Sequence, residues 1–145
     1  MCGIAGFWSV NSNEEESKLS LKKMAGALKH RGPDHIGYWH DNSDSIYFSH
    51  TRLSIIDLSQ EGNQPMISKS GRYVISFNGE IYNHKQLRIK LEEKNKSIKW
   101  RGYSDTEVLL ELIDIYGLKK ALKQCVGMFA LAIWDRKKKF LQLAR

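Results

Sequence analysis

The chain has 145 residues, of which 41% are hydrophobic and 27% charged, a balance typical of one soluble globular domain with a substantial core. No apolar run approaches the roughly 20 residues that a membrane-spanning helix needs. No basic leader precedes the apolar N-terminal stretch, so no secretory signal is expected and the cytoplasm is the expected location. The 23 Lys and Arg residues outnumber the 16 Asp and Glu residues, but they are scattered and accompany no nucleic-acid-binding motif, so the net charge of +7 favours a solvated surface.

The N-terminal half is expected to contain short strands and one helix. Residues 4–8 form an apolar run that suits a buried strand, and residues 17–29 carry apolar side chains at the i, i+3, i+4, i+7 spacing of a helix. The segment HRGPD then predicts a loop, because its Gly-Pro pair ends the helix. Further short strands are predicted over residues 37–39, 45–49 and 53–56, and a turn-rich stretch over residues 60–65.

In the C-terminal half, the alternating strand 72–77 is followed by Asn78-Gly79, which predicts a hairpin returning over residues 80–82 because this pair readily adopts positive φ. A helix is predicted over 85–93. Ser104-Asp105-Thr106-Glu107 predicts a capping box that opens a helix ending near Tyr116, before Gly117. The last predicted elements are a short helix at 118–124 and strands at 128–134 and 140–144.

These elements together indicate an α+β fold. The near-continuous apolar runs at residues 4–8 and 128–134 predict strands that are covered on both faces. Two sheets stacked between helix layers would provide that cover.

The two cysteines are expected to differ in role. Neither belongs to a C-x-x-C pair, so neither a zinc site nor a disulfide framework is predicted, and Cys125 is expected to be an inert core thiol. Removal of Met1 would make Cys2 the first residue. An ordinary α-amine titrates near ~7.7–8.0 and a free thiol near ~8.5, so the amine can take the thiol proton and one residue supplies both nucleophile and base. Taken alone, a cysteine at position 2 is more simply an accident.

Seven segments change that balance. They are MCGIAGFWS, HRGPD, HTRLSIIDLS, GNQPM, FNGEIYNH, SDTEVLLELI and GMFALAIWD. In this order and at these spacings they resemble the class II glutamine amidotransferase domain of the asparagine synthetase family. The resemblance covers essentially the whole chain, and FNGEIYN and SDTE are its most specific parts. It implies a four-layer αββα N-terminal nucleophile hydrolase sandwich of two antiparallel sheets. The implied activity is hydrolysis of glutamine to glutamate and ammonia through a cysteine thioester.

The same resemblance implies the roles of individual residues. Cys2 would be the nucleophile, and the Asn78 side chain and the Gly79 N–H would stabilise the oxyanion. Arg52 would bind the α-carboxylate and Asp105 the α-ammonium of glutamine. The implied glutamine-binding set is Arg52, Leu53, Ser54, Ile55, Ile56, Asn78, Gly79, Glu80 and Asp105. Without the resemblance, Arg52 would be a surface charge, Asn78-Gly79 a plain hairpin, and Asp105 a helix residue favoured by the dipole.

In the family a further segment completes the domain, and a synthetase domain that uses ATP and Mg follows. Because the sequence stops at LQLAR, residues 1–145 are expected to be a glutamine amidotransferase domain incomplete at its C-terminus, with no metal or cofactor of its own. The expected partners are glutamine and a synthetase domain or subunit that receives ammonia. An unpaired C-terminal strand edge also suggests a possible homodimer. Neither nucleic acid nor membrane is expected as a partner.

Three alternatives remain open. The chain could be an inactive glutamine-binding or interaction module. It could supply ammonia to a sugar-amidating enzyme of polysaccharide biosynthesis, because the acceptor is chosen outside this segment. More weakly, its basic composition allows a nucleic-acid-binding protein.

Overall fold

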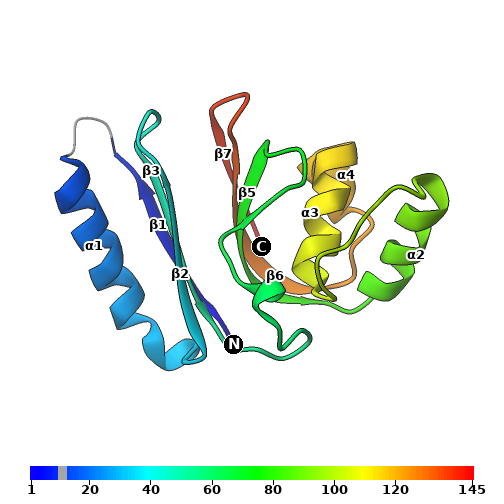
Figure 1. Ribbon diagram of the computed structural model, residues 1–145, viewed down its shortest axis with the longest axis horizontal. Helices are drawn as coiled ribbons and strands as arrows, with labels where there is room; N and C mark the ends of the chain where they lie inside the picture. The colour runs from blue at the N-terminus through cyan, green and yellow to red at the C-terminus, as the bar shows by residue number, and fades with distance from the viewer. Residues whose placement is uncertain (10–12) are drawn as a thin grey trace.

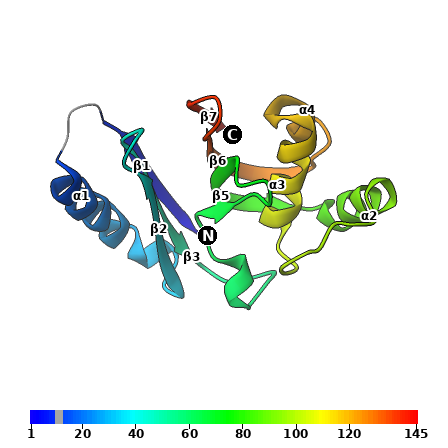
Figure 2. The same ribbon diagram turned by 45° about the horizontal axis from the view of Figure 1, so that its top comes forward.

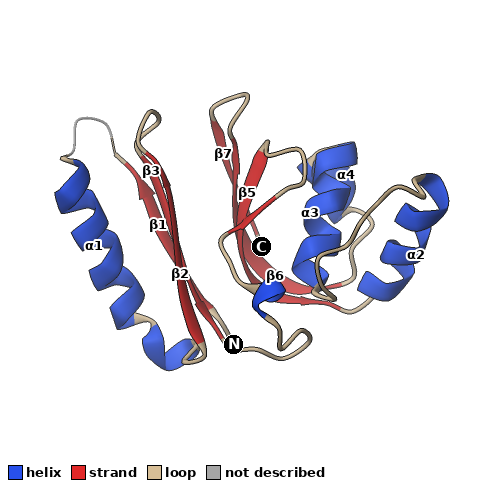
Figure 3. Ribbon diagram, viewed as in Figure 1, coloured by secondary structure: helices blue, strands red, loops and turns tan. Residues whose placement is uncertain are grey.

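Two antiparallel sheets form the centre of the molecule, and α-helices cover their outer faces (Figure 1). The computed structural model describes residues 1–9 and 13–145. Colouring by secondary structure shows strands in the two inner layers and α-helices in the two outer ones (Figure 3), and the turned view preserves this layering (Figure 2). The predicted α+β sandwich of helix, sheet, sheet and helix layers is therefore confirmed. Among the described residues, no helix is long and apolar enough to cross a membrane.

The first sheet has the strand order β1-β3-β2. Its strands are β1 (Gly3–Trp8), β2 (His35–Asp41) and β3 (Ile46–Arg52). The helix α1 (Glu14–Ala27) packs on its outer face and buries Leu21 and Ala25. This helix begins three residues before the predicted start, because the Asn13 side chain accepts hydrogen bonds from the first free N–H groups and so caps an earlier turn. A short 3-10 turn, η1 (Lys29–Arg31), then leads into β2.

The second sheet has the strand order β4-β5-β6-β7. Its strands are β4 (Met66–Ile67), β5 (Tyr73–Ile81), β6 (Gly127–Asp135) and β7 (Phe140–Ala144), and the 3-10 turn η2 (Gln60–Gly62) precedes them. Three helices cover its outer side: α2 (His84–Lys94), α3 (Asp105–Tyr116) and α4 (Leu118–Leu122). The apolar helix α3 packs directly on β5, and α2 and α4 pack on α3, so the larger hydrophobic core lies in this half.

The two sheets meet through different contacts along their length. Where β3 and β5 begin, the interface is apolar and contains Ile46, Phe48, Val74 and Trp134. Further along both strands the contacts become polar. His50 Nε2 donates to the Phe77 carbonyl at 2.9 Å, and Ser76 Oγ donates to the Ser49 carbonyl at 3.2 Å. The polar contacts therefore lie at the end of the interface where Cys2 enters β1.

Three predictions about strands are wrong. Residues 53–56 form no strand but an irregular segment after β3. Asn78-Gly79 makes no hairpin: β5 continues through the pair, with Asn78 opposite Ala130 and Gly79 opposite Phe129 on β6. The strands β1 and β6 are also not covered on both faces throughout, since Trp8 is 50% and Met128 58% exposed.

Candidate active site

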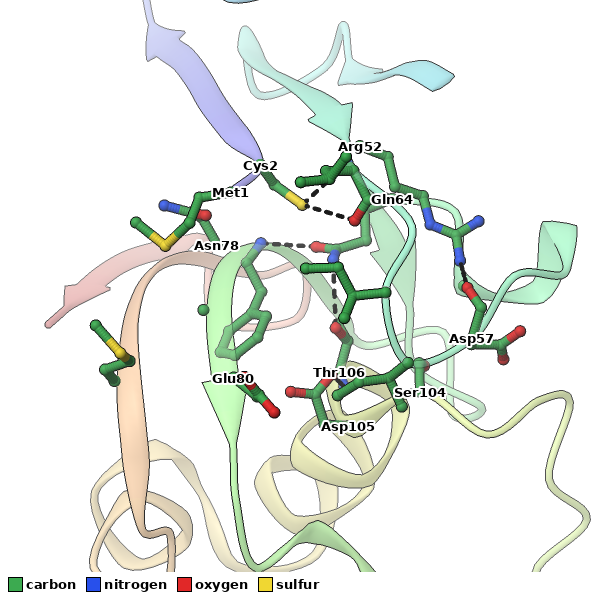
Figure 4. Close-up of a pocket in the computed structure, with 17 residues that line it drawn as sticks. Met1, Cys2, Arg52, Asp57, Gln64, Asn78, Glu80, Ser104, Asp105 and Thr106 are labelled. Carbon is green, nitrogen blue, oxygen red and sulfur yellow. Dashed lines mark hydrogen bonds between the residues drawn. The ribbon is translucent and has the colours of Figure 1, made fainter. Parts of the chain in front are cut away.

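The start of β1 and the end of β3 lie beside the later part of β5. Together with the start of α3 they enclose a pocket of about 120 Å³ (Figure 4). Most residues of the predicted site line it: Cys2, Arg52, Leu53, Ile55, Ile56, Asn78, Gly79, Glu80 and Asp105. Ser54 is not among the lining residues, and its N–H instead donates to Asp34 Oδ2 at 2.7 Å. The fold thus brings predicted site residues as distant in sequence as Cys2 and Asp105 to one pocket, and Ser54 is the exception.

Cys2 is held at the pocket by contacts to Leu53, which follows β3, and to Arg31 in η1. The Leu53 N–H donates to Cys2 Sγ at 3.4 Å, and the Arg31 Nε–H donates to the Cys2 carbonyl at 3.0 Å. The next residue, Gly3, lets β1 lie close to Thr51 on β3, because a Cβ at Gly3 would be 2.6 Å from Thr51 Oγ1. Met1 also lines the pocket and is 61% exposed. The thiol therefore sits in a defined position, next to a first residue that is accessible.

The second cysteine lies in a different environment. Cys125 is half-buried between α4 and β6, where its thiol donates to the Ala121 carbonyl at 3.3 Å. Burial raises the pKa of Cys125 to about 11. Its thiol is therefore protonated at neutral pH, as expected of an inert thiol, although Cys125 packs at the edge of the core rather than inside it.

Asn78 carries an unsatisfied side chain into the site. Its Oδ1 is buried without a hydrogen-bond partner, and the side-chain amide makes no hydrogen bond to any of the residues described. Buried side-chain amides are normally paired with protein groups or ordered water. An amide that is left free at the wall of a pocket can instead serve a ligand.

Gly79 presents its N–H to the same pocket. The Phe77 N–H donates to Gln64 Oε1 at 2.7 Å and the Ile81 N–H donates to Asp105 Oδ2 at 2.9 Å, both on the edge of β5 opposite β6. Residues two apart on a strand direct their N–H groups to the same edge, so the Gly79 N–H points between these two bonds. An added Cβ at Gly79 would lie 2.3 Å from the Met128 carbonyl, which explains the glycine by space rather than by a turn.

Asp105 occupies the first turn of α3, where Ser104 caps the helix by accepting the Glu107 N–H at 3.2 Å. Only this half of the predicted capping box forms, since the Glu107 carboxylate accepts the N–H groups of residues 101 and 102 instead. Asp105 is 5% exposed. Burial raises the pKa of its carboxyl, although the N–H donors of Ile81 and Thr106 act in the opposite direction.

The Arg52 guanidinium already makes hydrogen bonds to the neighbouring segment 57–63. Its guanidinium points away from Cys2 toward Asp57 (Figure 4), and it donates to the Ser59 carbonyl at 2.7 Å, to Asn63 Oδ1 at 2.8 Å and to the Asp57 carbonyl. The Asp57 carboxylate in turn accepts the Tyr103 N–H at 2.8 Å. Arg52 and Asp57 therefore tie the segment 57–63 to the segment before α3.

Two residues of the site were missed in the sequence. Gln64 and Thr106 line the pocket, are almost fully buried, and are joined by a hydrogen bond from Gln64 Nε2 to Thr106 Oγ1 at 3.3 Å. Gln64 belongs to the segment GNQPM, which carries part of the resemblance but implies no role for it. The sequence pattern places Thr106 only in the interior of a capping box.

Comparison with known proteins agrees with this geometry. Residues 1–145 match the family described as glutamine amidotransferase domain. The chain is 39% identical over 147 residues to asparagine synthetase (glutamine-hydrolyzing) 1 of Bacillus subtilis, and 32% identical over 154 residues to amidase chry2 of Gibberella zeae. Each alignment covers 100% of this chain and 22% of the relative, so the chain spans about a fifth of their length.

A solved structure shows the same fold. It is glutamine phosphoribosylpyrophosphate amidotransferase from B. subtilis, determined with ADP and GMP. The TM-score is 0.70 at 21% identity, covering 92% of this chain and 35% of that one. The predicted four-layer sandwich of two antiparallel sheets between helices is therefore a fold that this amidotransferase shares.

Proposed function

The chain belongs to the glutamine amidotransferase domain family, and from this premise we propose that it hydrolyses glutamine to glutamate and ammonia with Cys2 as nucleophile. One observation carries the proposal. The Cys2 thiol, the Asn78 side-chain amide, which makes no hydrogen bond to the described residues, and the buried Asp105 carboxylate line one pocket, although they come from the residue before β1, from β5 and from α3. Nucleophile, oxyanion donor and substrate anchor are the groups that acyl transfer from an amino-acid amide requires.

The proposed reaction begins with proton transfer from the Cys2 thiol to its own α-amine, which must be free and therefore requires removal of Met1. The thiolate attacks the side-chain carbonyl carbon of glutamine. The resulting oxyanion accepts hydrogen bonds from Asn78 Nδ2–H and the Gly79 N–H. The C–N bond then breaks, and ammonia leaves with the proton held by the amine. Water attacks the remaining thioester and releases glutamate, which restores the thiol.

Substrate recognition follows from the charged ends of free glutamine. In this proposal Arg52 supplies the cation for the α-carboxylate, and its bonds to the segment 57–63 fix the guanidinium in one orientation before the substrate arrives. Asp105 supplies the anion for the α-ammonium. Glu80 and the backbone of residues 53, 55 and 56 complete the wall. Ser54 is left out of this set, because its backbone bonds Asp34 outside the lining.

The test is glutamate and ammonia release from glutamine by purified protein whose Met1 has been removed. Cys2→Ala is expected to abolish turnover. Cys125→Ala is the matched control, since Cys125 lies away from the pocket and its removal should leave kcat unchanged. Turnover that persists in Cys2→Ala would refute the proposed nucleophile. Glutamine binding without any turnover by the processed wild type would instead support a binding module.

The second part of the proposal concerns the partner that receives the ammonia. We propose that a synthetase domain or subunit, which would use ATP and Mg, receives the ammonia, because the B. subtilis relative is an asparagine synthetase (glutamine-hydrolyzing). A sugar-amidating partner is the competing candidate. We also place the protein in the cytoplasm, where a thiol nucleophile is kept reduced. Co-purification of the synthetase partner, followed by product analysis with each acceptor, decides between the two.

A further inference from the structure

Gln64 occupies an unusual place between the layers of the molecule. It is 6% exposed, and it lies directly before Pro65 and the two-residue strand β4. Its backbone carbonyl is pressed against the first sheet, because a Cβ added at Gly37 would lie 1.9 Å from it. Its side chain enters the pocket beside the second sheet. Gln64 thus contacts both sheets at the end where Cys2 lies.

The carboxamide of Gln64 joins two elements that carry different parts of the site (Figure 4). Its Oε1 accepts the Phe77 N–H at 2.7 Å, one residue before Asn78. Its Nε2 donates to Thr106 Oγ1 at 3.3 Å, one residue after Asp105. A second bridge between the same elements is the bond from the Ile81 N–H to Asp105 Oδ2 at 2.9 Å. The two bridges bracket Gly79 on β5.

From this arrangement we propose that Gln64 is a positioning residue, which fixes the distance between the oxyanion donors on β5 and the ammonium-binding carboxylate on α3. The inference rests on the proposed glutaminase function. Glutamine must span the two places at once, with its amide carbonyl at Asn78 and its α-ammonium at Asp105. Because this part of β5 stays paired with β6, loss of the Gln64 bridge would let the start of α3 shift relative to β5 about the remaining Ile81 bond. A shift of this kind misaligns the oxyanion without removing any group that touches the substrate.

The experiment compares four substitutions in the processed protein. Gln64→Met keeps the side-chain volume and removes both hydrogen bonds. Thr106→Val removes only the hydrogen bond from Gln64 to α3, and Thr106→Ser retains it. The double variant Gln64→Met with Thr106→Val completes a double-mutant cycle. Gln86→Met, at an exposed position of α2, is the matched control. Each variant is measured for kcat/KM of glutamine hydrolysis, thermal midpoint, and the rate at which iodoacetamide alkylates Cys2.

Gln64→Met is expected to lower kcat/KM by about 10- to 100-fold, the loss that a displacement of about 1 Å produces in a reacting geometry. Thr106→Val should lose less, Thr106→Ser should restore activity to near wild type, and the double variant should be no worse than Gln64→Met. Alkylation of Cys2 should stay at the wild-type rate in every variant, because this reaction uses neither the oxyanion donors nor Asp105.

Several results would overturn the inference. They are a Gln64→Met activity within about threefold of wild type, losses that multiply in the double variant, or a parallel loss of Cys2 alkylation that reveals general collapse of the site. If Gln64→Met does not fold, the Thr106→Val and Thr106→Ser pair decides the matter, since both keep the bond to Phe77. An inactive wild type refutes the proposed function together with this inference, whereas an active wild type matched by Gln64→Met refutes the inference alone.

Discussion

Acidification should destabilise this fold through one buried histidine. His50 is fully buried between the sheets, and because its Nε2 donates to the Phe77 carbonyl, the neutral ring leaves Nδ1 without a proton and without a partner. Burial lowers the pKa of His50 from its ordinary 6.5 to about 4; the Phe77 carbonyl opposes this effect, and the positive charges of Arg52 and His35 add to it. Protonation would place a charged N–H where no acceptor exists.

The magnitude follows from the difference between the two states. Because the folded pKa lies below the unfolded one, the stabilisation is fully present above pH 6.5 and is lost as the pH falls through about 4. At ~1.4 kcal/mol for each pKa unit, the loss reaches roughly 2 kcal/mol by pH 5 and about 3 kcal/mol by pH 4. Such a loss is a large part of the stability of an ordinary domain.

The assay compares wild type with His50→Gln, whose amide can still donate to the Phe77 carbonyl but cannot titrate. Urea unfolding at several pH values gives the free energy of unfolding for both proteins. The difference between them should shift by about 3 kcal/mol between pH 7.5 and pH 4 in favour of the variant. Subtracting the two curves removes the carboxylates and other histidines, which both proteins share. Parallel curves across this range would refute the assignment of acid lability to His50.

Four further predictions concern the active site. Asn78→Ala should lower kcat by roughly 10²–10³ with little change in KM, as measured by steady-state glutamate release, and a loss below about threefold would contradict the oxyanion role. Gly79→Ala should lower both kcat and the thermal midpoint, because its methyl group would lie 2.3 Å from the Met128 carbonyl. Wild-type values in both assays would show that the β6 backbone can move away without loss of activity or stability. Protein that retains Met1, identified by intact mass, should be inactive, and full activity in that form would exclude the α-amine as base. Finally, kcat/KM should fall on acidification at a pH above the pKa of an ordinary aspartate, because burial raises the pKa of Asp105 and only its ionised form attracts the ammonium. Asp105→Asn should remove this decrease of kcat/KM at low pH, and an unchanged decrease would assign it to another group.

Local pattern predicted the elements better than their connections. The helices α2, α3 and α4 and the strands β6 and β7 lie close to their predicted ranges, because apolar periodicity and caps act within a few residues. The Asn78-Gly79 pair failed for a tertiary reason. Pairing with β6 extends on both sides of it, and the glycine serves the close approach of Met128 and Phe129 rather than a turn. A turn signal does not reveal which strand will lie alongside.

The site depended on the resemblance far more than the fold did. No periodicity brings Cys2 beside Asn78, which lies 76 positions later, and each residue alone had a simpler interpretation. The strand predicted over residues 53–56 was wrong because its β-branched residues line a pocket wall instead of joining a sheet. The role of Gln64 was hidden for a related reason. A polar residue in a turn-rich segment gives no sign that its carboxamide will be buried against two other elements.

The shortness of β4 connects these observations. In the register Met66–Ile75 and Ile67–Val74, continued pairing would place Pro65 opposite Ser76 and Gln64 opposite Phe77. Instead β4 begins only at Met66, and Gln64 meets the Phe77 N–H with its side-chain Oε1 rather than with its backbone carbonyl. Beyond that point Asp105 takes the Ile81 N–H. A β4 longer by four residues would occupy the Gly79 N–H with a backbone carbonyl, so ending this strand early is what leaves an oxyanion donor open to the pocket.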